Sequence, residues 1–193
     1  MPTLSVVPDL AASDATTAAA GMSTASFEAG FSQVFSQRFA PLFRYLARLT
    51  GDKDLASDLA QDAFVRLYRR GELPLGVGAW LVTVAHNQLR DQQRSVRRRL
   101  RLLVTGRERV PTPTPAVEPH VEVLAAEQRQ RVRAVLTRLT ERDQQILLLH
   151  HSDFSYREIS VVLDIVESGV GTTLRRAEAA FRQAFEETYG APD

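Results

Sequence analysis

Arginines cluster in one short stretch of the chain, where their chemistry suits a nucleic-acid partner. Five of them fall within the eight positions from 94 to 101, and all but one of the 24 basic residues of the chain are arginine. Guanidinium groups bind phosphate in a bidentate manner and stack on bases. Arg94 and Arg98 are four residues apart, so they share one face of a helix. A solvated helix face is the alternative for any charged run, and we favour a binding function because polar residues extend the same face: Thr83, Asn87, Arg90 and Asp91.

A second polar cluster is acidic and precedes the arginines. Asp54, Asp58, Gln61 and Asp62 lie at helical spacing, opposite an apolar face at every fourth residue from Leu55. Solvation of a surface helix would explain such a face. An acidic patch beside a strongly basic one instead suggests two partners of opposite charge.

A third candidate site lies near the C-terminus, where the sequence predicts two helices joined by a tight turn. Ser155 and Glu158 have the spacing of a capping box, which would open a helix ending near Leu163. A second amphipathic helix would start near Ser168, and this outline is that of a helix-turn-helix. Its polar face carries side chains that could contact bases and phosphates, namely Ser168, Thr172, Arg175, Arg176 and Gln183.

Nothing in the sequence indicates an enzyme, a metal site or a cofactor site. A glycine-rich phosphate loop is absent, and the acidic cluster lacks a pocket. The four histidines have neither cysteine partners nor the spacing of a metalloprotease motif. We expect His150 and His151 to end a helix, where a cation complements the helix dipole.

The elements that must position these residues are helices. Alternation at period two is missing, so we expect an all-α protein. Ser26 is the predicted N-cap of the first helix, and Pro41 should kink or split it. A loop is expected at 71–78. The expected helices cover residues 26–50, 54–70, 79–102, 121–138, 141–151, 156–163 and 168 onward.

Composition divides the chain into two small helical domains joined by an extended linker. Residues 1–25 are rich in Ala, Thr and Ser and are expected to be disordered. The first domain is expected at 26–103 and the second at 123–189. Between them, the proline-rich segment 104–122 is the expected linker.

Charge is distributed very unevenly along the chain. The formal net charge of the 193 residues is only +1, which taken alone argues against a nucleic-acid partner. Residues 1–37 carry −3, residues 38–110 carry +8 and residues 111–193 carry −4. Residues 38–110 therefore carry the excess of positive charge that is typical of a nucleic-acid-binding protein and that the whole chain lacks. The absence of cysteine, of a membrane-spanning run and of N-terminal basic residues predicts a cytoplasmic protein with no membrane insertion.

Two motif blocks carry a resemblance to a known family. The segment Asp58-Leu59-Ala60-Gln61-Asp62-Ala63-Phe64, followed by Trp80-Leu81, Asn87 and Asp91-Gln92-Gln93-Arg94, resembles region 2 of the extracytoplasmic-function sigma factors of bacterial RNA polymerase. The segment Leu139-Thr140-Glu141-Arg142-Asp143-Gln144, with Ser155-Tyr156-Arg157-Glu158-Ile159 and Arg176-Ala177, is similar to their region 4. Both blocks occur in the family's order with a linker of suitable length between them.

The resemblance implies a protein that directs core RNA polymerase to promoters and helps to melt them, without catalysis of its own. Its partners would be the largest and second-largest polymerase subunits, promoter DNA and, as a further candidate, an anti-sigma factor. By resemblance, Asp58, Gln61 and Asp62 would bind the clamp helices of the largest subunit. The −10 element would be bound by Thr83, Asn87, Arg90, Asp91, Arg94 and Arg98. The −35 element would be bound by Ser168, Thr172, Arg175 and Arg176.

Some positions depart from the family pattern. Ser160 and Asp164 stand where Ala and Gly are usual, and Asp can still adopt the turn conformation. Gly171 and Thr173 replace residues that are commonly basic, which weakens the expected contact with the −35 element. Two alternatives therefore stay open: a stand-alone helix-turn-helix regulator, and an adaptor that binds polymerase or an inhibitor without reading DNA.

Overall fold

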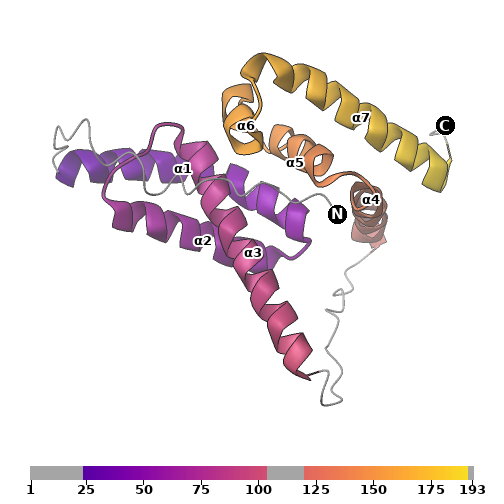
Figure 1. The fold of residues 1–193 in the computed structure, drawn as a ribbon, viewed down its shortest axis with the longest axis horizontal. Coiled ribbons are helices and arrows are strands. Elements are labelled where there is room, and N and C mark those ends of the chain that lie inside the picture. The colour runs from indigo at the N-terminus through magenta and orange to yellow at the C-terminus, as the bar shows by residue number, and fades with distance from the viewer. Residues whose placement is uncertain (1–23, 104–119, 191–193) are drawn as a thin grey trace.

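The computed structural model describes residues 24–103 and 120–190, and within these ranges the only regular elements are seven α-helices (Figure 1). The prediction of an all-α protein is confirmed. The helices are α1 (Thr24–Thr50), α2 (Lys53–Arg70), α3 (Val77–Leu103), α4 (His120–Leu136), α5 (Glu141–His150), α6 (Tyr156–Leu163) and α7 (Glu167–Tyr189). The predicted N-terminal tail lies outside the described residues except for its last two positions, which belong to α1.

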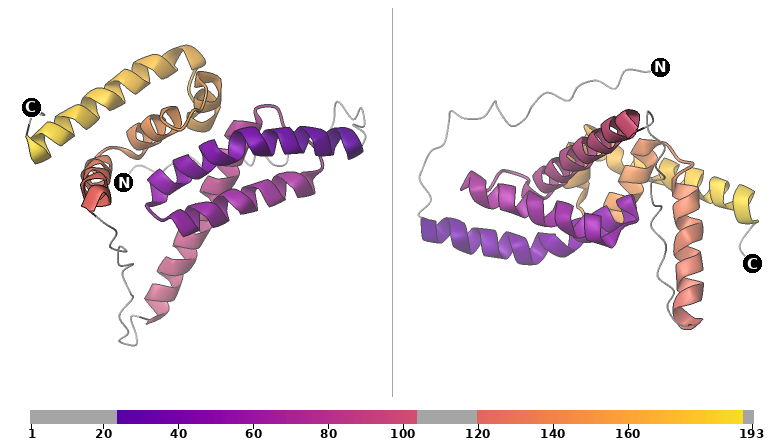
Figure 2. Two further views of the ribbon diagram at one scale, coloured as in Figure 1. Left: turned by 180° about the vertical axis from the view of Figure 1, so that it is seen from behind. Right: turned by 90° about the horizontal axis from the view of Figure 1, so that it is seen from below.

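Helices α1 and α2 form an antiparallel pair that α3 crosses (Figures 1 and 2). The side chain of Asp52 caps α2 by accepting hydrogen bonds from the amides of Asp54 and Leu55. At the other end, Gly71 adopts the left-handed conformation with φ 73°, which terminates the helix as predicted. On the face of α2 that repeats every four residues, Leu59, Ala63 and Leu67 are buried and Leu55 is half-buried, as expected for a helix packed on a neighbour.

The start and the continuity of α1 differ from two predictions. The helix begins at Thr24, so Ser26 lies inside the first turn and is not the N-cap. The helix is also not split at Pro41 but continues through it, although proline removes one backbone hydrogen bond. Pro41 is buried, and its buried neighbours Leu42, Tyr45 and Leu46 anchor the following turns. Tertiary packing thus outweighs the local penalty.

The predicted loop at 71–78 is shorter than expected because α3 starts at Val77. The amide of Trp80 donates a hydrogen bond to the carbonyl of Gly76 at 3.1 Å, which forms the first helical turn. Gly76 has φ 71°, a left-handed conformation suited to the turn that precedes the helix. Gly78, which was predicted to lie in the loop, belongs to the first turn of α3 and is buried.

Local capping chemistry defines the C-terminal helices as the sequence indicates. Thr140 caps α5, and the Ser155–Glu158 capping box that opens α6 is fully formed. Asp164 ends α6 in the left-handed conformation with φ 51°, so the helix-turn-helix turn forms without glycine. His150 is the last residue of α5 and His151 its C-cap, as expected. The final helix starts at Glu167, one residue before the predicted Ser168.

The two groups of helices, α1–α3 and α4–α7, share one hydrophobic core in this structure. Tyr45 from α1 contacts Phe154 from the α5–α6 turn, with ring centroids 6.1 Å apart. Helix α6 packs against both α3 and α7, and α1 packs against α5. The predicted linker at 104–122 lies largely outside the described residues, and its last three positions belong to α4.

Candidate nucleic-acid and polymerase interfaces

Helix α3 exposes a polar stripe on the side that faces away from the core. Every residue predicted for the −10 element whose side chain the structure describes is exposed: Thr83, Asn87, Arg90, Asp91 and Arg94. The side chain of Arg98 lies outside the described side chains. On the opposite side, Leu81 and Ala85 are buried. The helix is therefore fixed by its apolar face and presents donors and acceptors to solvent.

The charged residues of this stripe make only weak ion pairs. Arg94 lies 3.9 Å from Asp91 on the same helix, and Arg90 lies 3.9 Å from Glu141 at the start of α5. All four side chains are more than half exposed, so solvent screens both pairs. Phosphate groups can replace such partners at little cost.

A largely buried polar pair joins α3 to α1 beneath the stripe. The hydroxyl of Tyr45 lies 2.6 Å from Nε2 of His86. Burial, with a smaller contribution from the positive charge of Arg90, lowers the pKa of His86 to about 4. Burial also raises the pKa of Tyr45 well above its usual value. His86 is therefore neutral at pH 7, and the Tyr45 hydroxyl donates to Nε2.

The acidic face of α2 is also exposed. Asp58, Gln61 and Asp62 all point away from the buried face, and the amide of Gln61 donates to the Ser57 hydroxyl at 3.0 Å. Asp54 is exposed at the start of the same helix. Together they form a contiguous acidic surface on the first two turns and the middle of α2.

The N-terminal part of α7 presents the predicted −35 side chains to solvent. Ser168, Thr172, Arg175 and Arg176 are exposed, while Val170, Leu174 and Ala177 are buried. Of the two departures from the family pattern, Thr173 is half-buried and donates its hydroxyl to the carbonyl of Gly169 at 2.9 Å. Gly171 is half-buried, and a Cβ there would lie 3.7 Å from the ring of Tyr156. Neither position adds a donor for DNA.

The sequence reasoning missed a set of contacts between the two groups of helices. Three arginines of α1 make these contacts. Arg38 pairs with Glu158, and Arg44 pairs with Asp153. Arg48 donates hydrogen bonds to the backbone carbonyl of His151 and to the side-chain hydroxyl of Ser152. The sequence pattern identified Glu158 only as the partner of Ser155 in a capping box. Its second partner, Arg38, is 120 positions away in the chain, and no local spacing signals such a pair.

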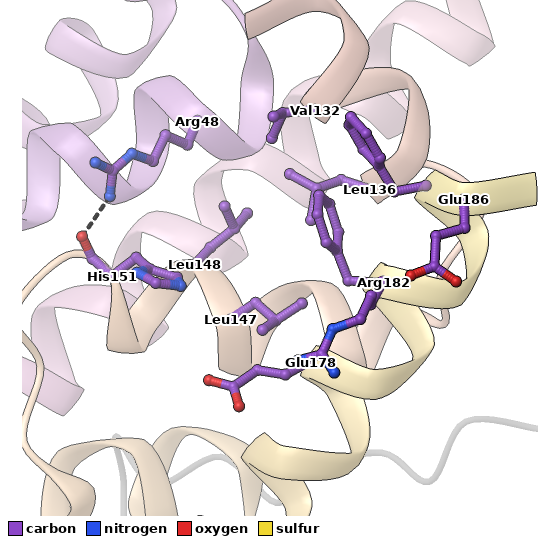
Figure 3. A pocket seen from close by; sticks show the side chains of 11 residues that line it. Arg48, Val132, Leu136, Leu147, Leu148, His151, Glu178, Arg182 and Glu186 are labelled. Carbon is purple, nitrogen blue, oxygen red and sulfur yellow. Dashed lines mark hydrogen bonds between the residues drawn. The ribbon is translucent and has the colours of Figure 1, made fainter. Parts of the chain in front are cut away.

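An apolar groove lies beside this contact, between α4, α5 and α7 (Figure 3). Its volume is about 770 Å³. Arg48 lies at its edge and donates a hydrogen bond to the carbonyl of His151, drawn as a dashed line in Figure 3. Its apolar lining consists of Val132, Leu136, Leu147, Leu148, Phe181 and Phe185. The groove therefore leaves part of the apolar face of α7 uncovered.

Among the residues that the structure describes, no three His, Asp or Glu side chains are grouped so as to hold a metal ion. The same part of the chain contains no helix that is long and apolar enough to cross a membrane.

Two family models match the chain, one over each group of helices. Sigma-70 region 2 matches residues 35–99, and Sigma-70 region 4 matches residues 129–181. The first match contains the acidic face of α2 and the stripe of α3 up to Arg98, and the second contains α5, α6 and the polar face of α7.

Two sigma factors of known sequence and one solved structure match most of the chain. The chain is 30% identical over 148 residues to the ECF RNA polymerase sigma factor SigL of Mycobacterium tuberculosis, covering 74% of this chain and 81% of that protein. It is 29% identical over 145 residues to the RNA polymerase sigma factor YlaC of Bacillus subtilis, covering 72% and 82%. Among solved structures, the sigma factor RpoE of Bartonella quintana, in complex with the anti-sigma factor NepR, matches in fold with a TM-score of 0.57 and 19% identity over 81% of this chain and 97% of that one. The chain therefore belongs to the extracytoplasmic-function sigma factors, which direct RNA polymerase to promoters.

Proposed function

We propose that the chain is a promoter-specificity subunit with three separate binding surfaces, one each on α2, α3 and α7. The acidic face of α2 would bind core RNA polymerase, the stripe of α3 would bind the −10 element, and the polar face of α7 would bind the −35 element. The observation that carries this proposal is that all three surfaces are exposed while the opposite face of each helix is buried. No surface competes with another for the same side chains.

The stripe on α3 suits a melted strand better than a duplex. It combines neutral donors and acceptors at Thr83 and Asn87 with the guanidinium groups of Arg90 and Arg94. Extruding a base costs roughly a few kcal/mol, and contacts to the unpaired base and to its backbone offset that cost. Arg98 continues the register of Arg94 and would extend the track.

The acidic face of α2 would bind a basic surface of polymerase. By analogy with the family, Asp58, Gln61 and Asp62 would contact the clamp helices of the largest subunit, and the second-largest subunit would contact the chain elsewhere. The opposite charges of α2 and α3 support the division, because phosphate repels the first surface and attracts the second.

The polar face of α7 would contact the −35 element through Ser168, Thr172, Arg175 and Arg176. Two arginines and two hydroxyls provide few contacts, and Gly171 and Thr173 add none. We therefore propose weak recognition of this element by α7, so that binding would depend more on α3 and on polymerase. The protein would catalyse no covalent chemistry and would act in the cytoplasm, where the chromosome lies.

Mobility shifts with duplex promoter DNA, with and without core polymerase, test this proposal. We expect a specific shift only when the chain and core are both present. A specific complex with a palindromic duplex in the absence of core would identify a stand-alone regulator instead. Core binding without any promoter preference would identify an adaptor. An anti-sigma factor is a further proposed partner, supported by the fold neighbour that was solved with one.

A further inference from the structure

We propose that the first two turns of α7 select base pairs that contain thymine in the −35 element, through the methyl groups of Val166 and Thr172 and not through a guanidinium group. The inference rests on the proposed function, because it requires α7 to enter the major groove of that element. It goes further by naming the class of base that α7 binds. The segment concerned is residues 166–173, called here the reading segment, and Val166 is the N-cap of α7.

Val166 occupies a position that neither the core nor the helix cap explains. Its side chain is 73% exposed, so it contributes little to the hydrophobic core. As the N-cap of α7 it makes no side-chain hydrogen bond to the first turn, although Ser, Thr, Asp and Asn are preferred there for that purpose. A residue that breaks a local rule without a structural gain is expected at a functional surface. The exposed isopropyl group is therefore available to an apolar partner.

The first turn of α7 fixes the place of this isopropyl group. A Cβ at Gly169 would lie 3.3 Å from Cγ2 of Val166, so the valine side chain lies against the turn at a residue that has no side chain of its own. Ser168 and Thr172 are exposed and four residues apart, so they share one face of the helix. Along the axis, Val166 and Thr172 are separated by about 9 Å, roughly the rise of three base pairs. The two residues can therefore contact different base pairs of one groove.

The reading segment cannot bind guanine in a bidentate manner. Guanine presents two acceptors, O6 and N7, in the major groove, and Arg or Lys is their usual partner. Positions 166–173 contain neither residue type. Gly171 has no side chain, and the hydroxyl of Thr173 donates to the carbonyl of Gly169 at 2.9 Å. The exposed carboxylate of Glu167 adds negative charge, which disfavours a base edge that presents two acceptors.

Thymine is the base that such a surface complements. It presents a methyl group in the major groove, where apolar side chains and the methyl group of threonine contact it. The hydroxyls of Ser168 and Thr172 can also donate to O4 of thymine or accept from N6 of its adenine partner. Burial of one methyl group strengthens binding by about fourfold. Two such contacts give a modest selectivity, in agreement with the weak recognition proposed for α7.

The two arginines of this surface follow the reading segment. Arg175 and Arg176 are exposed in the third turn of α7. In a helix-turn-helix, the N-terminal residues of the second helix contact the base edges. The guanidinium groups are therefore assigned to the phosphates, which supply affinity without information about the sequence.

Sequencing of the DNA that the holoenzyme selects tests the base preference. A promoter library keeps one −10 element and randomises the −35 element, and the full chain with core polymerase binds it. We expect enrichment of thymine, on either strand, at two positions of the −35 element. Guanine or no preference at these positions, with dependence on the −10 element retained, would overturn the inference and leave the proposed function standing. A holoenzyme that depends on neither element would overturn both.

Replacement of thymine by uracil tests the methyl contact itself, because uracil lacks only the methyl group. Each replacement at a selected position should weaken holoenzyme binding by about fourfold. In holoenzyme that carries Val166→Ala, the penalty at one position should fall below about twofold. The matched control is Val161→Ala, which shortens another exposed valine, on α6, and should leave every penalty unchanged. Equal penalties in the two variants would overturn the role of Val166.

Two further variants distinguish the reading segment from the arginines. Gly171→Arg adds a guanidinium group at a position where a Cβ meets only an ordinary contact, 3.7 Å from the ring of Tyr156. We expect this variant to shift selection toward guanine by about tenfold or more. Arg175→Ala should weaken binding to all sequences alike, because it removes a phosphate contact. A changed base preference in Arg175→Ala, with none in Gly171→Arg, would assign base recognition to the third turn and overturn the inference.

Discussion

The hydrogen bond between Tyr45 and His86 places a titratable group at the junction of α1 and α3. Because burial lowers the pKa of His86 to about 4, the folded chain takes up this proton only near pH 4, whereas the unfolded chain takes it up near pH 6.5. The unfolded state therefore binds more protons between these two pH values. The contribution of His86 to stability is fully present above pH 6.5 and is lost as pH falls toward 4.

This linkage predicts a pH-dependent difference between the protein and a His86→Gln variant. Gln accepts a hydrogen bond from Tyr45 but does not titrate, so the free energy of unfolding of the variant lacks this contribution. Relative to the variant, the unaltered protein should lose roughly 3 kcal/mol between pH 7 and pH 4. Urea unfolding across that range measures the difference, and His151→Gln, at an exposed site, is the control. Parallel profiles for His86→Gln and the unaltered protein would contradict the assignment.

Arg94 carries the second prediction at the residue scale. Its side chain is 73% exposed on the α3 stripe, so its removal should leave the fold and core binding intact. Loss of one backbone or base contact costs about 1–3 kcal/mol, and we expect open-complex formation to fall by about tenfold. Permanganate reactivity of unpaired thymines in the −10 element measures this directly. Arg142→Ala, which removes an exposed arginine from α5, should have a much smaller effect.

At the scale of elements, helix ends were predictable because capping is local chemistry. Gly71, Thr140 and the Ser155–Glu158 box end or begin helices where the sequence indicates. The continuation of α1 through Pro41 was not predictable, because buried contacts of the following turns outweigh the local penalty of proline. Gly78 was read as part of a loop for the same reason: only packing against α6 shows why glycine is required there.

Two glycine substitutions separate close packing from helix propensity. Gly78→Ala would bring a Cβ to 2.0 Å from a carboxylate that is fixed by its cap, so we expect a loss of about 1–3 kcal/mol in the free energy of unfolding. Gly171→Ala meets only an ordinary contact of 3.7 Å with Tyr156 and should gain about 0.5–1 kcal/mol. Thermal and urea unfolding of both variants measure whether each substitution lowers or raises the free energy of unfolding. Stabilisation by Gly78→Ala would show that α3 and α6 are not packed as described.

At the scale of the whole molecule, the distribution of charge explains more than its total. The net charge of +1 hides a block of +8 that contains the α3 stripe. The acidic face of α2 lies in the same block. Helix α7, which we propose to bind the −35 element, lies in the block of residues 111–193, whose net charge is −4. The sequence predicted these surfaces because each is a helical repeat within one segment. It could not predict the contacts of Arg38, Arg44 and Arg48, because their partners are more than a hundred residues away.

The same balance predicts weak DNA binding by the chain alone. Without polymerase, binding to duplex DNA should be non-specific, with a dissociation constant of about 10⁻⁶ M or weaker at physiological salt. Fluorescence anisotropy at increasing salt should show the loss of even this affinity. Tight, sequence-specific binding by the free chain would contradict the role of a polymerase subunit.

The most direct test of the central claim is run-off transcription with purified core RNA polymerase on a library of genomic promoter fragments. The account predicts defined transcripts that require both the chain and core, and that weaken when Asp58 and Asp62 are changed to Lys, because a basic face would repel its polymerase partner. Arg69→Glu, an exposed charge reversal elsewhere on α2, is the control and should retain activity. Failure of the unaltered chain to bind core or to start transcription from any fragment would contradict the account.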